Sequence, residues 1–143
     1  MNRHTRNLRD IITLFALAVA GQALAAVSVV ITPSGSFNIT PGVAVTNQSI
    51  GSILINADLS SYEVTLRDDN SGLLKNGANS MSYTVKYNGG SQLVLSTTPL
   101  SVETGSTVTN GNRTLTIFVP SNDSIGVPAG NYTSTITVEI LAV

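Results

Sequence analysis

Residues that could perform chemistry are few in this chain of 143 residues, which has one histidine and no cysteine or tryptophan. A serine nucleophile usually needs a base to take its proton, and the histidine, His4, belongs to the export signal described below. Neither a Gly-x-Ser-x-Gly nor a Ser-x-x-Lys motif occurs. Without histidine or cysteine ligands a zinc site is excluded, and no glycine-rich nucleotide motif is present. The sequence therefore predicts a protein that is not an enzyme and has no cofactor.

One acidic cluster, Asp68-Asp69-Asn70, offers two weaker possibilities. Two carboxyl groups about 5 to 9.5 Å apart can hydrolyse a glycoside, but alternation along an extended chain points adjacent side chains apart. The three side chains could also present oxygens to Ca²⁺, although the spacing of the standard calcium loop and its distal glutamate are missing. Since Ser71 and Gly72 follow, the cluster is interpreted as a solvated turn.

The N-terminal residues 1–25 have the composition of a secretory signal. Three arginines precede an apolar run over residues 11–20, and Ala23-Leu24-Ala25 supplies the small residues of a cleavage site. A membrane anchor would need about 20 apolar residues, and Gly21-Gln22 interrupts this run early. Cleavage is expected after Ala25, and the mature protein is expected in the periplasm and then at the cell surface or secreted.

The charge left after cleavage excludes sequence-independent binding to nucleic acid. Binding to the phosphate backbone needs several cations on one face. The basic residues of the mature chain are scattered along it and are outnumbered by acidic ones; they are Arg67, Lys75, Lys86 and Arg113.

Apolar and polar residues alternate with period two in several runs, which predicts β-strands. These runs cover residues 27–32, 53–55, 62–66, 83–87, 115–119 and 132–140. Asn88-Gly89-Gly90 predicts a hairpin, Asn110-Gly111-Asn112 is expected to open the strand at Arg113, and a turn over 127–131 precedes the last strand. Pro33 and Pro41 bracket a short run that suits a sheet edge. The pattern predicts one antiparallel β-sandwich of about 7–8 strands, in which the tyrosines pack in the core rather than forming a sugar-stacking platform.

The mature chain is divided into residues 26–35, an N-terminal strand and hinge, and residues 36–143, the sandwich domain. In the first segment, Val27, Val29 and Ile31 alternate with Ser28, Val30 and Thr32. A strand with this much β-branched apolar surface aggregates if it stays unpaired. It therefore pairs either within its own domain or with a neighbouring molecule, and the sequence leaves both open.

The closing strand carries the most particular motif. Pro128, Ala129, Gly130, Tyr132, Ser134 and Ile136 match the pattern Pro-Ala-Gly-x-Tyr-x-(Asp/Ser)-x-(Ile/Val). Together with the order of strands from Ile50 onward, this motif resembles the spore coat protein U domain, the fold of pilins of the archaic chaperone–usher type. That family usually carries a cysteine pair, which this chain lacks.

The resemblance implies an immunoglobulin-like sandwich that lacks one strand and is completed by the N-terminal extension of the next subunit, a form of β-augmentation. Residues 27–32 would be the donor strand, with Val27, Val29 and Ile31 as its apolar face. The implied partners are copies or sister subunits, a periplasmic chaperone and an outer-membrane usher, in a pilus, fibre or coat. The acceptor groove for the donor strand would be lined by Ile53, Leu66, Tyr83, Ile117 and Ile136.

The alternative to this function is a self-contained secreted module that binds carbohydrate or a surface protein.

Overall fold

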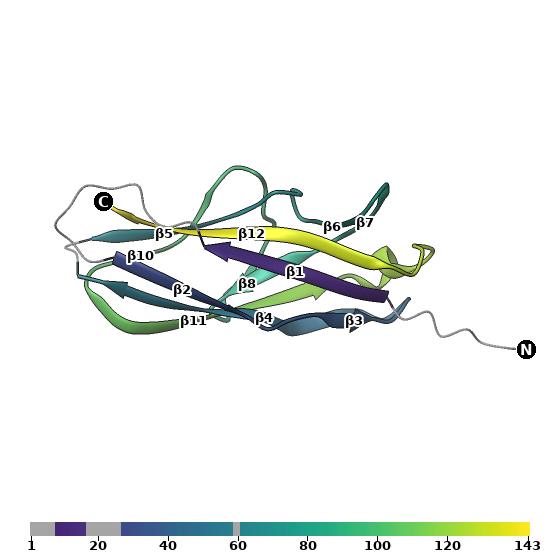
Figure 1. The fold of residues 1–143 in the computed structure, drawn as a ribbon, viewed down its shortest axis with the longest axis horizontal. Coiled ribbons are helices and arrows are strands. Elements are labelled where there is room, and N and C mark those ends of the chain that lie inside the picture. The colour runs from purple at the N-terminus through teal and green to yellow at the C-terminus, as the bar shows by residue number, and fades with distance from the viewer. Residues whose placement is uncertain (1–7, 17–26, 59–60) are drawn as a thin grey trace, which may run out of the picture.

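The computed structural model describes residues 8–16, 27–58 and 61–143, and the expected cleavage position Ala25 lies outside them. Two sheets pack face to face as a β-sandwich (Figure 1), which confirms the predicted fold class. No helix in this described part of the chain is long and apolar enough to cross a membrane.

The first sheet, called sheet A, has the strand order β10-β5-β12-β1-β3, and the hairpin of β6 and β7 attaches to β12. Neighbouring strands in it are antiparallel except for β1 and β12, which are parallel. Its members are β1 (Leu8–Ala16), β3 (Phe37–Ile39), β5 (Tyr62–Asp68), β6 (Leu73–Asn76), β7 (Asn79–Ser82), β10 (Leu100–Gly105) and β12 (Asn131–Ala142).

The second sheet, called sheet B, has the order β2-β4-β11-β8-β9, and all its neighbours are antiparallel. A 3-10 turn, η1 (Ser121–Ser124), follows its central strand β11. Its strands are β2 (Val27–Pro33), β4 (Val45–Ala57), β8 (Thr84–Tyr87), β9 (Gln92–Leu93) and β11 (Val108–Val119).

The core lies between the sheets and consists mainly of the alternating residues that the sequence indicated. The five side chains predicted to face the interior are buried, each with 2% or less of its surface exposed: Ile53, Leu66, Tyr83, Ile117 and Ile136. All four tyrosines are buried as well, so their interpretation as core residues is confirmed. The tyrosines contribute large apolar surfaces to a chain without tryptophan.

One local expectation was wrong. Asn110-Gly111-Asn112 does not open a strand but lies inside β11, where the register to β4 shifts between Val108 and Gly111 and Asn110 has φ 49°. A bulge of this kind uses a residue that tolerates positive φ without ending the ladder. The run 83–87 is confirmed as strand β8 over 84–87, and the chain leaves sheet A after Ser82 and enters sheet B at Thr84. Tyr83 lies at this crossing.

Candidate strand-acceptor site

Strand β1 occupies the position between β12 and β3 in sheet A (Figure 1). It runs parallel to β12 over eight Cα pairs, from Arg9 opposite Asn131 to Ala16 opposite Val138. On its other side it runs antiparallel to β3, with Leu8 opposite Ile39 and Asp10 opposite Phe37. Both neighbours therefore have their edges completed by residues 8–16.

Those residues belong to the segment that the sequence predicts to be cleaved. Without them, β12 and β3 would both present an unpaired backbone edge, which is a template for another strand. The side chains beneath these edges are core residues of the two strands. They are Ile39 on β3 and Tyr132, Ser134, Ile136, Val138 and Ile140 on β12. We call the position between β12 and β3 the acceptor site.

The candidate donor strand lies elsewhere, at the edge of sheet B. Strand β2 pairs antiparallel with β4 over seven Cα pairs, from Val27 opposite Ala57 to Pro33 opposite Gly51. Ile31 packs against the core from this position, while Val30 is 53% exposed. The structure thus describes residues 27–33 as a strand of their own domain with one neighbour. Their transfer to another molecule stays a prediction.

The closing-strand motif forms one compact corner at the start of β12. The Tyr132 hydroxyl donates a hydrogen bond to the Pro128 carbonyl oxygen, 2.9 Å away. Gly130 faces the Asn76 side-chain amide so closely that a Cβ at this position would collide with it. Ile136, four residues further along the same face of β12, is buried in the core. The motif therefore fixes where β12 begins and which of its faces points inward.

Replacing Tyr132 with phenylalanine is expected to lower the free energy of unfolding by about 1 kcal/mol, because the Pro128 carbonyl loses its partner. Tyr83→Phe is the matched control, since the buried Tyr83 hydroxyl has no hydrogen-bond partner among the residues that the structure describes. That variant should be neutral or slightly more stable. Urea unfolding of both variants measures the difference, and equal losses would contradict the assigned hydrogen bond.

A polar cluster ties the two sheets together at the edge opposite the acceptor site. Glu103 on β10 accepts hydrogen bonds from Arg113 Nη2 and Nε of β11 at 2.6 and 2.7 Å. It also accepts them from the hydroxyls of Tyr62 on β5 and Tyr87 on β8 at 2.7 and 2.6 Å. The bidentate arginine, with smaller effects from the two hydroxyls, lowers the pKa of Glu103 to about 2 although burial opposes this. Sequence reasoning missed this cluster because its four members lie on four strands that meet only when the two sheets pack.

The Asp68 carboxylate is buried and bonded, which corrects its interpretation as part of a solvated turn. It accepts hydrogen bonds from the backbone N–H of Gly72 at 2.5 Å and of Asn70 at 3.2 Å, and from the Ser134 hydroxyl. Asp69 points the other way and pairs with Arg67 at 3.1 Å. The two carboxylates thus point apart, as expected for adjacent residues, and Asp68 serves as the cap of the turn.

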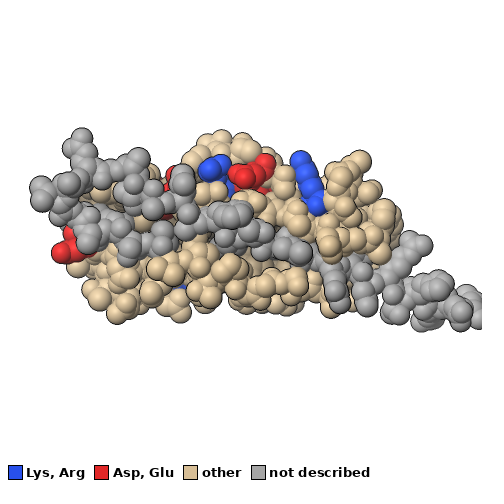
Figure 2. Space-filling model, in the orientation of Figure 1, with Lys and Arg blue, Asp and Glu red and all other residues tan. Residues whose placement is uncertain are grey.

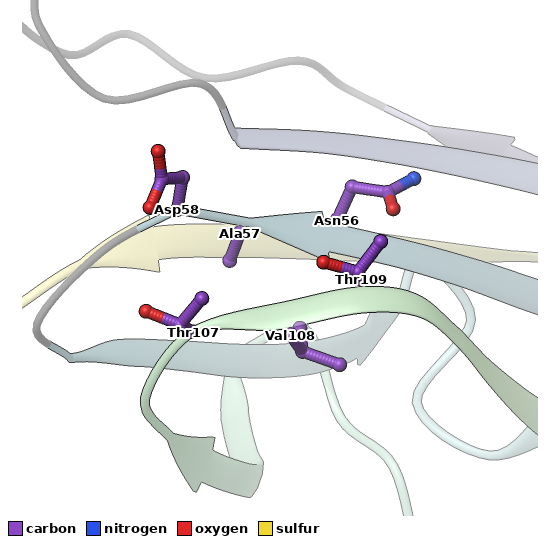
Figure 3. A pocket seen from close by; sticks show the side chains of 6 residues that line it. All are labelled: Asn56, Ala57, Asp58, Thr107, Val108 and Thr109. Carbon is purple, nitrogen blue, oxygen red and sulfur yellow. The ribbon is translucent and has the colours of Figure 1, made fainter.

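A shallow pocket of about 450 Å³ lies at the end of β4. Figure 3 shows the side chains of Asn56 and Thr109 beside each other at its wall, and Asn56 Oδ1 also accepts the backbone N–H of Asn110 at 2.6 Å. Among the described residues, its lining offers hydrogen-bonding groups but no aromatic ring on which a sugar could stack. The lining residues are Asn56, Ala57, Asp58, Thr107, Val108 and Thr109.

Compared with models of known protein families, the chain matches none, and no curated protein matches it either. The resemblance to the spore coat protein U domain, inferred from the closing-strand motif and the order of strands, therefore stays a prediction.

Proposed function

We propose that this chain is an exported structural subunit of a surface fibre, pilus or coat, and that subunits join by adding a strand at the acceptor site. The observation that supports this most is the origin of β1. The strand that completes sheet A between β12 and β3 comes from residues 8–16, which lie within the predicted signal. A mature chain that begins at Ala26 needs a replacement strand from another molecule.

The Tyr132 corner supports the assignment of an immunoglobulin-like sandwich with its last strand missing. In such sandwiches a tyrosine near the start of the penultimate strand bonds back to the backbone a few residues upstream. Tyr132 does so at the start of β12, and the position beside β12 on the side of β3 is held by β1. The strand that would follow it is the one whose place β1 takes.

The single neighbour of β2 supports the proposed exchange of this strand. Within their own chain, residues 27–33 pair with one neighbouring strand, β4. In the acceptor site of another copy, the same residues would have β12 on one side and β3 on the other, as β1 has here. A strand with two neighbours satisfies backbone groups along both of its edges. The donor is therefore the 27–32 segment of the next subunit, with Val27, Val29 and Ile31 filling pockets on alternate positions.

The proposed role is not catalytic and needs no cofactor. The resemblance adds a periplasmic chaperone and an outer-membrane usher as assembly partners. Charged side chains are scattered among the described residues that Figure 2 leaves uncovered, and the four basic residues after Ala25 leave nucleic acid outside this proposal.

A fusion of the donor segment to the C-terminus tests the proposal. Domain 34–143 is compared with the same domain carrying residues 26–33 after Val143 through a short turn-forming linker. The appended strand can return beside β12, so the fusion is expected to raise the thermal midpoint by about 5 °C or more and to stay monomeric. A fusion with Val27, Val29 and Ile31 changed to serine is the matched control and should gain little. If the unaltered fusion gains nothing and chain 26–143 stays monomeric, the proposal is wrong.

A self-contained secreted binding module is the second candidate, and the seven-residue pairing of β2 with β4 favours it. This function predicts that chain 26–143 is a stable monomer at every concentration. Size-exclusion chromatography between about 1 µM and 1 mM distinguishes the candidates, because strand addition between subunits follows mass action.

A further inference from the structure

The strand in the acceptor site belongs to the same chain and precedes the predicted cleavage position. We propose that Leu8–Ala16 acts as an intramolecular plug: before cleavage it keeps the acceptor site closed, and removal of residues 1–25 makes the chain competent to accept a strand. This inference rests on the proposed function and concerns its regulation.

The pairing of β1 closes both edges of the acceptor site at once. Eight positions of β12, from Asn131 to Val138, are opposite residues of β1. All three residues of β3 are opposite β1 as well. Each edge of a strand binds one neighbour through its backbone groups, so an incoming strand cannot pair with β12 or β3 over these positions while β1 is in place.

The connection to β2 explains why the plug holds before cleavage and is released after it. Residues 17–26 join β1 to β2, which is anchored on β4 from Val27 onward. A short tether of this kind gives the plug an effective concentration in about the millimolar range, well above that of a free strand at micromolar levels. Cleavage after Ala25 removes the tether and turns the plug into a separate peptide, whose occupancy then falls on dilution.

The parallel direction of β1 adds to this dependence on the tether. A strand that followed β12 through a tight turn would run antiparallel to it, whereas β1 runs parallel. Parallel pairing is slightly less stable per residue. The untethered plug is therefore expected to dissociate more readily than an antiparallel strand of equal length.

Hydrogen exchange at the backbone amides of β12 tests the plug directly. The full chain 1–143 is produced without export and carries a site for a sequence-specific protease within residues 22–26. Before cutting, the β12 amides should be protected along the edge that faces β1. After cutting and removal of the released peptide, their protection should fall about 100-fold or more, while amides of β12 bonded to β5 keep theirs.

Proline variants provide the control within the uncut chain. Ile12→Pro with Leu14→Pro removes backbone donors from the middle of β1 and weakens its pairing, so the β12 edge should lose protection without any cut. Asn2→Pro with Arg3→Pro carries the same number of prolines before β1 and should leave protection unchanged.

Equal protection of the β12 edge in the uncut, cut and Ile12→Pro/Leu14→Pro chains would overturn the plug. The proposal that a strand of another subunit fills the acceptor site would still be supported if the C-terminal fusion of residues 26–33 raises the stability of the domain. A fusion without any gain would instead remove the proposed function, whatever the cut does, so the two failures are distinguishable.

Discussion

Replacing Asp68 with alanine is expected to lower the free energy of unfolding by about 3 kcal/mol or more, and the thermal midpoint by about 10 °C. The carboxylate is fully buried, and it accepts hydrogen bonds from Gly72 N–H, Asn70 N–H and the Ser134 hydroxyl. Alanine leaves these donors without their acceptor in the interior, and an unsatisfied buried donor costs about 1–3 kcal/mol. The Asp68 carboxylate also links the turn after β5 to β12, because Ser134 lies on that strand, and the substitution removes this link.

Asp68→Asn separates the charge from the hydrogen bonds. The amide keeps one acceptor oxygen but presents an NH₂ group to a backbone N–H. We therefore expect the free energy of unfolding to fall by about half as much as in Asp68→Ala. The matched control is Asp69→Ala, because Asp69 is 51% exposed and pairs with Arg67 at the surface; its effect should stay within about 0.5 kcal/mol. Urea unfolding measures all three, and similar losses at positions 68 and 69 would contradict the capping role.

Replacing Glu103 with alanine is expected to destabilise the domain by about 3 kcal/mol. The Glu103 and Arg113 side chains are 16% and 20% exposed, so the guanidinium would remain largely out of water without its carboxylate. The hydroxyls of Tyr62 and Tyr87 lose their acceptor as well. In the double variant Glu103→Leu/Arg113→Met both charges are absent, and since paired removal is often nearly neutral, it should be more stable than Glu103→Ala.

The same carboxylate makes stability depend on pH in the acid range. The pKa of Glu103 falls from its ordinary 4.5 to about 2 in the folded protein, chiefly through Arg113. A lowered folded pKa means that the contribution is fully present above about 4.5 and is lost as the pH falls toward about 2. The loss should amount to at most about 3 kcal/mol for this shift.

Unfolding measured between pH 6 and pH 2 tests this, with Glu103→Gln as the variant that cannot titrate. Its stability should fall less steeply below pH 4.5 than that of the unaltered chain. Glu139→Gln is the control, because Glu139 makes only a longer contact with Arg67 at 3.9 Å. An identical acid slope in the unaltered chain and in Glu103→Gln would show that Glu103 is not the group responsible.

The sequence predicted the strands whose side chains alternate and the turns with a strong local signal. β5 matches the 62–66 run, and the Asn88-Gly89-Gly90 hairpin joins β8 to β9, with Val85 opposite Leu93. These features depend on neighbours in the chain, where the period of two and the preference of Asn-Gly for positive φ act directly.

Features that depend on distant residues could not be predicted. The burial of Asp68 depends on Ser134, 66 positions away, and the Glu103 cluster needs four strands to meet. The chain crosses from one sheet to the other at Tyr83 because of how the two sheets pack. The alternation of apolar and polar residues continues through this position, so the sequence gives no signal of the crossing. β1 shows the same limit, since an apolar signal segment carries no information about which strand edge it will complete.

The Glu103 cluster lies on β10, β5, β11 and β8, whereas β2 is the edge strand at the opposite side of sheet B and β1 lies next to the edge strand β3 at the opposite side of sheet A. The sandwich is therefore held along one side by charge-assisted hydrogen bonds, and along the other by the strands that the proposed function exchanges between subunits. Local opening in a folded protein concentrates where such ties are few. For the proposed strand addition, this arrangement predicts that local opening is confined to the margin that receives a strand, while the Glu103 cluster holds the two sheets in register at the other.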